Sequence, residues 1–305
     1  MDLFKVITVL LVGMICYPSN DLQAQVEGEY IWRDRMEEMV YQADVMRNAS
    51  MSKHRKRAGD IFHQLFKEHL DDKDYNNKID NDIAKFVSNI SPLDSTFKVY
   101  TWQIDEGHEY RYYGFIQLAD GRWIELIDNQ EGLGINYDLL NAENWYGVLY
   151  YNIYSFHSDN NNYYLLFGYD AKDQFSNRKV IDVLSFDESG NAVLGAPVFV
   201  MNEAVRPDEQ YRYVIEYDEN AFVRLNYDPS LHKIVFDHLI PLGNMNPGQN
   251  METMVPDGSY SGFEFQQGKW IFKEKLFHLT SEKPPGTGKP KEEEKRDLFG
   301  RKKKQ

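Results

Sequence analysis

The sequence contains a single cysteine, Cys16, among 305 residues. Cys16 lies in an apolar run near the N-terminus, and its removal would leave a chain without any thiol. Such a chain cannot form disulfides, zinc–thiolate sites or a cysteine nucleophile. We therefore expect the mature protein to be stabilised by packing alone.

Common catalytic signatures are also missing. The sequence has no Gly-x-Ser-x-Gly, no His-Glu-x-x-His and no phosphate-binding loop. Basic residues are not in excess either, because the net charge of the chain is −14. Nucleic-acid binding needs a basic surface, so no nucleic-acid partner is expected. No cofactor is predicted.

Long hydrophobic runs are absent. The longest, Val6–Tyr17, has about a dozen residues, whereas a helix that spans a membrane needs about 20. With Lys5 before it and a polar stretch that ends at Ala24 after it, the segment 1–25 is typical of a signal peptide cleaved after Ala24. We expect a periplasmic or extracellular protein with no transmembrane segment in the mature chain. Lipidation at Cys16 is the alternative, but bulky Ile15 does not fit a lipobox.

Charge is unevenly distributed along the chain. The tail 281–305 has nine Lys or Arg against five Asp or Glu, which gives it a net charge of +4. The residues before it therefore have a net charge of −18, and the whole chain has −14. Its Pro- and Gly-rich start predicts disorder. This basic tail would suit contact with an anionic surface, and a simple solubility role is the alternative.

The segment 26–93 has a helical pattern. Apolar residues from Ile31 to Met46 recur at spacings of three and four, and a second such stretch follows Ser52, which would cap it. A weaker helix is predicted over 79–90. The sequence at Asp72–Asn76 begins like a calcium loop, but Asn77 and Ile83 replace the glycine and the glutamate that such a loop requires.

The segment 94–280 has the pattern of an antiparallel β domain. Short stretches rich in Val, Ile, Tyr, Phe and Trp alternate with turns such as Asp120-Gly121, Ser189-Gly190-Asn191 and Gln267-Gly268. The predicted fold is α+β and β-dominated, with a helical N-terminal segment packed on a large antiparallel β-meander. A sandwich, an open barrel and a partial propeller all fit. The predicted strands are 97–103, 110–118, 122–128, 145–156, 163–169, 179–187, 192–200, 211–217, 222–227, 233–238, 260–265 and 269–277.

Aromatic residues are the one compositional excess, with 21 Tyr, 18 Phe and 5 Trp. Exposed rings stack on sugars or fill protein interfaces, and the candidate ligand-binding residues are Trp102, Trp123, Trp145 and Tyr146. Cross-strand packing inside the sheet is the alternative. The burial of these rings distinguishes the two hypotheses.

A metal site is a further candidate. His232 and His238 are six residues apart, so on a continuous strand both would point to one face. Two histidines need at least one more ligand, which the sequence does not locate.

A set of short motifs in the segment 97–277 resembles a group of uncharacterised secreted proteins of Bacteroidota-type bacteria. The resemblance implies export across the inner membrane, and no functional residue carries over, because no activity comes with it. Its motifs are 100–103 (Tyr-Thr-Trp-Gln), 111–114 (Arg-Tyr-Tyr-Gly), 144–147 (Asn-Trp-Tyr-Gly), 168–170 (Gly-Tyr-Asp), 179–184, 234–239 and 256–260.

These observations favour an exported, non-enzymatic binding or scaffold protein of the cell envelope, with an envelope protein or a glycan as partner. A glycan-active hydrolase is the first alternative, and it would need a cleft with two carboxylates about 5–10 Å apart beside an exposed aromatic ring. A metal-binding module around His232 and His238 is the second.

Overall fold

The computed structural model describes residues 20–79, 81–129, 134–201, 208–243 and 254–277, and the side chains from residue 29 onward. Most of the predicted signal peptide and the whole basic tail 281–305 lie outside this part of the chain. Among the helices described, none has the length and apolar character needed to cross a membrane.

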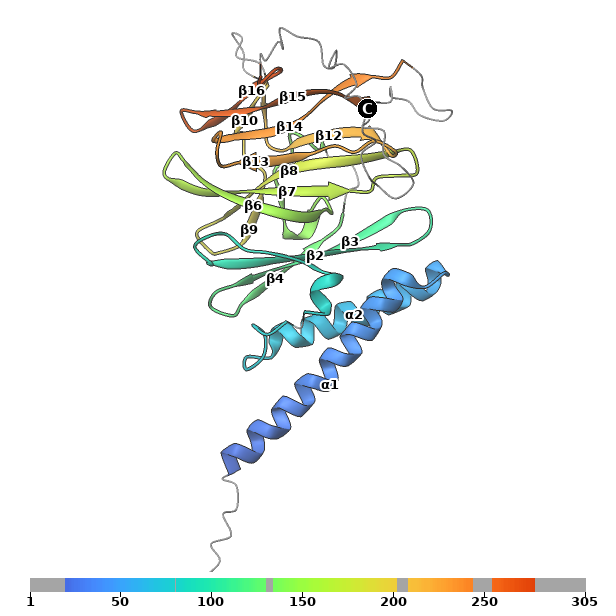
Figure 1. The fold of residues 1–305 in the computed structure, drawn as a ribbon. Coiled ribbons are helices and arrows are strands. Elements are labelled where there is room, and N and C mark those ends of the chain that lie inside the picture. The colour runs from blue at the N-terminus through green and yellow to red at the C-terminus, as the bar shows by residue number, and fades with distance from the viewer. Residues whose placement is uncertain (1–19, 80, 130–133, 202–207, 244–253, 278–305) are drawn as a thin grey trace, which may run out of the picture.

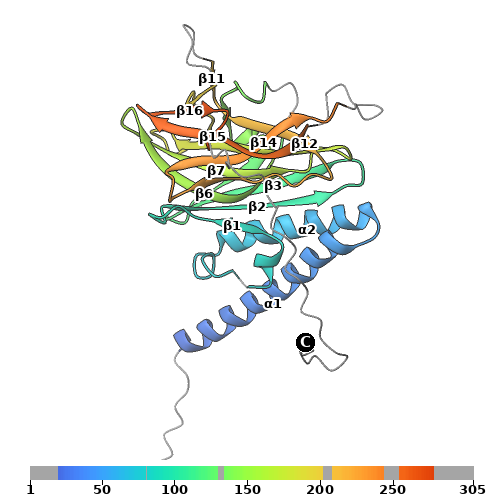
Figure 2. The same ribbon diagram turned by 45° about the horizontal axis from the view of Figure 1, so that its top comes forward.

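The protein is built of four stacked layers, one helical and three of β-sheet (Figure 1). Helices α1 (Asn20–Asn48) and α2 (Ser52–Asp71) form the first layer, and in both views they lie on the same side of the sheets (Figure 2). The predicted β-dominated α+β fold is thereby confirmed.

The layer next to the helices, here called the helix-side sheet, has the strand order β1-β2-β3-β4 and is antiparallel throughout. A short 3-10 helix, η1 (Ile83–Lys85), precedes it. Its strands are β1 (Ser88–Ile90), β2 (Phe97–Asp105), β3 (Tyr110–Leu118) and β4 (Trp123–Ile127).

The middle sheet has the order β5-β9-β8-β7-β6, with β12 paired to β8 as well. A 3-10 helix, η2 (Ala142–Asn144), follows its first strand. The strands are β5 (Leu140–Asn141), β6 (Leu149–Ser158), β7 (Asn161–Asp170), β8 (Ser176–Phe186), β9 (Ala192–Leu194) and β12 (Tyr213–Asp218).

The outer sheet has the order β11-β10-β16-β15-β14-β13, and its pair β10–β16 is parallel. Each sheet thus contains a meander of four consecutive strands. The strands of the outer sheet are β10 (Phe199–Val200), β11 (Glu209–Gln210), β13 (Leu225–Asp228), β14 (Lys233–Pro241), β15 (Met254–Gln266) and β16 (Lys269–Lys273).

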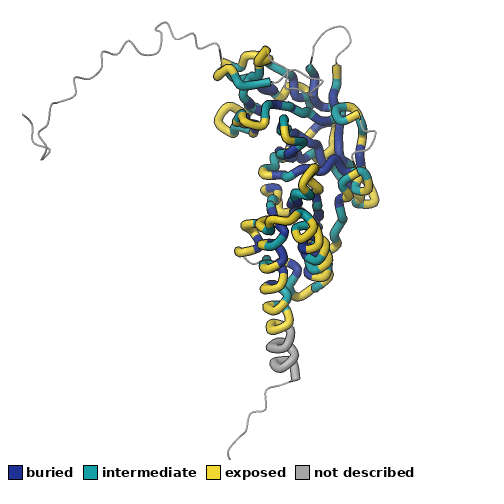
Figure 3. Tube along the Cα trace, turned by 90° about the vertical axis from the view of Figure 1, so that its right-hand side faces the viewer, coloured by how far each residue is buried: buried dark blue, intermediate teal, exposed yellow. Residues whose placement is uncertain are grey.

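Three hydrophobic clusters fill the three spaces between layers. The buried residues are therefore distributed along the whole stack of sheets (Figure 3). Side chains alternate between the two faces of a strand, which β7 illustrates. Leu166 packs in the cluster toward the helix-side sheet, while Leu165 and Phe167 pack in the cluster toward the outer sheet. The middle sheet is therefore buried on both faces.

Several predicted elements differ from the structure. The predicted helix 79–90 is instead η1 followed by β1. The predicted strand 145–156 begins only at Leu149, because Gly147 has φ +76°, which interrupts an extended strand. The predicted strand 192–200 is divided into β9 and β10 at Gly195, where φ is +108°. The predicted turn Gln267-Gly268 is confirmed, with positive φ at both residues.

One histidine in the helical layer is entirely buried. The side chain of His69, in the last turn of α2, packs against Phe66 and has no hydrogen-bond partner at either ring nitrogen within the described residues. Burial, together with the nearby cations of Arg35 and Lys98, lowers the pKa of His69 to about 4, although the Asp72 carboxylate opposes this shift. The folded protein therefore holds His69 neutral.

Acidification is expected to destabilise the protein through His69. The unfolded state takes up a proton near pH 6.5 and the folded state only near pH 4, so this stability is complete above pH 6.5 and is lost as the pH falls. Between pH 7.5 and 5 the loss is about 2 kcal/mol. Urea unfolding of the wild type and of His69→Gln at both pH values measures it.

The control for this experiment is His108→Gln, at an exposed position. We expect His108→Gln to keep the wild-type pH dependence and His69→Gln to reduce it. Equal pH dependence in all three proteins would contradict the assignment to His69.

Candidate functional site

Three of the four predicted ligand-binding aromatics are in the interior. Trp102, Trp145 and Tyr146 have no exposed surface. Trp102 faces the helices and packs against Phe62 and Tyr113, while Trp145 donates a hydrogen bond from Nε1 to the Tyr150 hydroxyl at 2.9 Å. A ring without exposed surface cannot stack on a ligand at the surface, so the prediction of a sugar platform at these three residues is corrected to core packing.

The fourth aromatic, Trp123 on β4, is only partly buried. Its Nε1 donates to Asp71 Oδ1 at 2.8 Å, and the Lys67 ammonium lies 5.7 Å from its ring centroid. Lys67 also pairs with Glu125, which contacts His63. Trp123 therefore joins α2 to β4 through polar contacts.

His232 and His238 do not share a strand face. His232 lies in the turn before β14 with φ +52°, and the strand register shifts between Asp237 and Leu239. The imidazoles have different neighbours, Tyr227 Oη at 3.4 Å from His232 Nδ1 and Ser261 Oγ at 2.8 Å from His238 Nδ1. Within the described residues no group of three or more His, Cys, Asp or Glu is placed to hold a metal ion.

A polar pocket of about 420 Å³ opens at the edge where the helix-side sheet meets the middle sheet. It is formed where β3 begins and where β4 and β7 end, so three chain segments far apart in sequence meet there. Its lining residues include Tyr110, Tyr112, Asp128, Asn129, Asp170 and Lys172.

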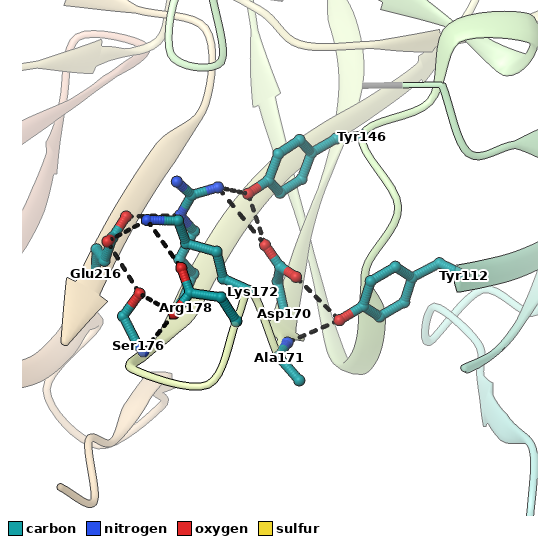
Figure 4. Close-up of polar contacts among 9 residues, drawn as sticks. Tyr112, Tyr146, Asp170, Ala171, Lys172, Ser176, Arg178 and Glu216 are labelled. Carbon is teal, nitrogen blue, oxygen red and sulfur yellow. Dashed lines mark hydrogen bonds and ion pairs between the residues drawn. The ribbon is translucent and has the colours of Figure 1, made fainter. Parts of the chain in front are cut away.

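Asp170 forms the inner wall of this polar pocket. The residue is 3% exposed, and its two carboxylate oxygens accept hydrogen bonds from the hydroxyls of Tyr112 at 2.9 Å and Tyr146 at 2.8 Å (Figure 4). Burial raises the pKa of Asp170, although the two tyrosine hydroxyls and the Arg178 cation act in the opposite direction. The Tyr112 hydroxyl in turn accepts the backbone N–H of Ala171.

A second carboxylate, Glu216 on β12, continues the polar cluster. It accepts hydrogen bonds from Lys172, Ser176 and Arg178 Nε, the last at 2.9 Å (Figure 4). Burial alone would raise the pKa of Glu216, but the two cations outweigh it and the pKa is lowered. Lys172 at the pocket wall is thus held in place by a paired carboxylate.

Behind this cluster lies a fully buried ion pair. Asp182 and Arg212 have no exposed side-chain surface, and Arg212 Nη2 is 2.8 Å from Asp182 Oδ1. The Tyr150 hydroxyl donates to Asp182 Oδ2, and the Arg212 guanidinium lies 5.9 Å from the Tyr146 ring centroid. Tyr146 therefore contacts both the inner pair and Asp170, and polar side chains continue from the core to the pocket.

The positions of these groups limit what the pocket can do chemically. Both oxygens of Asp170 are engaged, and Asp128 Oδ2 accepts the backbone N–H of Tyr112 at 2.9 Å. A general acid must present its proton to the substrate, whereas each Asp170 oxygen already accepts a hydrogen bond from a tyrosine hydroxyl. The arrangement is better suited to holding a polar ligand than to transferring a proton.

Sequence reasoning missed Asp170, Asp182 and Arg212. One signal was available, because Asp182 stands within a strand of apolar residues, where a charge is rarely buried unless it is paired. Its partner Arg212 is 30 residues away, and no periodicity relates the two. Tyr112 and Asp170 are 58 residues apart and likewise meet only through the sheet packing.

Neither a protein-family model, nor a curated protein, nor a solved structure matches this chain. The function is therefore inferred from the chemistry of the pocket and of the polar cluster behind it.

Loss of the inner cation should be costly. Arg212→Met leaves the Asp182 carboxylate buried without its ion-pair partner, and we expect the free energy of unfolding to fall by about 3–5 kcal/mol. Urea denaturation measures the change. Replacement of both charges in Arg212→Met/Asp182→Leu should recover much of the loss, because no unpaired charge remains.

The matched control is Arg122→Met, since Arg122 forms an exposed ion pair with Asp120. Solvent screens such pairs, so little change is expected. An Arg212→Met variant as stable as Arg122→Met would show that the buried pair has no such role.

Proposed function

We propose that this protein is an exported, non-enzymatic binding protein of the cell envelope that holds a glycan in the polar pocket. The observation that carries the proposal is the pocket itself, in which carboxylates and an amide lie beside an exposed tyrosine ring. Sugars present hydroxyl groups at their rims and C–H groups on their faces. Carboxylates accept hydrogen bonds from hydroxyls, amides both accept and donate them, and aromatic rings contact the apolar faces.

Tyr110 supplies the aromatic surface that Trp102, Trp145 and Tyr146 do not. It is 37% exposed, stands at the start of β3 and lines the pocket. Export to the envelope remains part of the proposal and rests on the segment 1–25. The acidic body of the protein favours a neutral or cationic ligand over a strongly anionic one.

A glycan-active hydrolase is the second candidate, and the same pocket is the observation that favours it. Glu109, Asp128 and Asp170 line one cavity together with the exposed Tyr110. A glycosidase needs one carboxyl group as acid and another as base or nucleophile. The engagement of both Asp170 oxygens by tyrosine hydroxyls weighs against this role.

A printed glycan array, followed by calorimetric titration of each retained glycan, tests the binding proposal. We expect retention of at least one glycan, and a loss of affinity of about fivefold or more in Tyr110→Ala, because stacking on an aromatic ring contributes about 1 kcal/mol or more. Tyr30→Ala is the matched control, because Tyr30 is exposed on α1 away from the pocket.

The two candidates differ in what becomes of the glycan. Prolonged incubation should leave a retained glycan intact, as measured by chromatography of its products. Release of reducing ends by the wild type, abolished in Asp128→Asn, would replace the binding proposal with the hydrolase. Retention of no glycan by the array would reject the binding proposal.

A further inference from the structure

A second pocket lies directly beside the polar pocket and shares Tyr110 with it. This mixed pocket has a volume of about 520 Å³ and lies where the end of α1 and the segment 84–88 meet β2 and the start of β6. Its lining residues include Met46, Arg47, Val87, Gln103, Tyr110 and Leu149.

The strand register places the two pockets side by side. Gln103 on β2 is paired with Tyr112 on β3, and Asp105 is paired with Tyr110. Paired residues of an antiparallel sheet lie on the same face with Cβ atoms about 5 Å apart. Gln103 in the mixed pocket and Tyr112 in the polar pocket are therefore neighbours, and a ligand that contacts Tyr110 can enter both.

The chemistry of the mixed pocket differs from that of the polar pocket. The Gln103 Oε1 atom is buried and has no hydrogen-bond partner in the part of the chain that the structure describes. Because Gln103 lines the pocket, a turn of its side-chain amide brings this acceptor to a ligand donor, and the hydrogen bond so formed is one that the free protein lacks.

Arg47 supplies a donor near the same pocket. Its Nη1 donates to the Lys85 carbonyl at 2.8 Å, and its guanidinium lies 5.9 Å from the Phe86 ring centroid. A guanidinium carries five N–H groups, so this contact fixes the group and leaves donors for a ligand. Met46, Val87 and Leu149 give the pocket an apolar wall.

We infer that the mixed pocket receives the acetamido group of an N-acetylated amino sugar, whose neighbouring sugar unit occupies the polar pocket across Tyr110. An acetamido group combines three features that this pocket matches. Its N–H donates to Gln103 Oε1, its carbonyl accepts from Arg47, and its methyl contacts the apolar wall. This inference rests on the proposed glycan-binding function and names the class of glycan.

Calorimetric titration of the full chain with tri-N-acetylchitotriose and with cellotriose tests it. The two neutral trisaccharides have the same β-1,4-linked backbone, and cellotriose has hydroxyls in place of the acetamido groups. We expect the acetylated sugar to bind the wild type about tenfold more tightly, the value of one hydrogen bond and one buried methyl group. Because this comparison uses the wild type, it stands even where a variant fails to fold.

Gln103→Met assigns the preference to the mixed pocket. Methionine has nearly the shape of glutamine but no amide, so the variant should bind both trisaccharides with similar affinity. Tyr110→Ala should weaken both, because Tyr110 lines both pockets, and Tyr30→Ala should change neither.

Three other outcomes would overturn the assignment of the acetamido group to the mixed pocket. Equal binding of the two sugars by the wild type, weakened by Tyr110→Ala, would overturn the acetamido assignment and leave the proposed glycan function standing. A preference that persists in Gln103→Met would also overturn it. Binding of neither trisaccharide overturns the assignment, while the glycan array judges the wider proposal independently.

Discussion

The buried ion pair between Asp182 and Arg212 constrains everything around it. Removal of two charges from water costs several kcal/mol for each ion, and only good geometry with further hydrogen bonds offsets this cost. Here Asp182 also accepts from the Tyr150 hydroxyl, and Arg212 Nη1 donates to the Ile135 carbonyl at 2.8 Å. The backbone at Ile135 is held to the middle sheet by these contacts.

Hydrogen bonds that satisfy buried charged groups also extend from this ion pair to the pocket. Tyr146 contacts Arg212 with its ring and Asp170 with its hydroxyl, and Tyr112 reaches Asp170 from the helix-side sheet. The backbone N–H of Tyr112 then fixes Asp128, and the backbone of Asn129 bonds to the Trp145 carbonyl. Hydrogen bonds to two buried carboxylates, Asp170 and Asp182, therefore join the pocket wall to the ion pair behind it.

Local pattern predicted much of the fold. The three- and four-residue spacing of apolar residues from Ile31 to Met46 gave the first helix, and glycines such as Gly121 and Gly268 gave the hairpins. The prediction of a strand through Trp145 and Tyr146 was wrong, because Gly147 adopts a positive φ that the neighbouring sequence does not indicate. Gln103 illustrates the larger difficulty. Its pairing with Tyr112 follows from the hairpin, but its place beside Leu149 depends on how two sheets stack.

None of the four aromatic residues predicted as ligand-binding lines the candidate pocket. The tyrosine excess and the search for carboxylates beside an exposed ring were sound physical criteria, and the pocket around Tyr110 combines both features. Sequence could not decide which rings are exposed, because a strand buried on both faces and a strand exposed on one face can both be rich in tyrosine. Burial by the neighbouring sheets settled that point for Trp102, Trp145 and Tyr146.

The central claim is that ligands bind at the edge between the helix-side and middle sheets. Chemical-shift mapping of the ¹⁵N-labelled protein, titrated with tri-N-acetylchitotriose, tests this most directly because it reports position rather than affinity. We expect the largest amide shifts at Gln103, Tyr110 and Asp128 and their immediate neighbours. Shifts confined to another face, such as the exposed side of α1 around Tyr30, would contradict it.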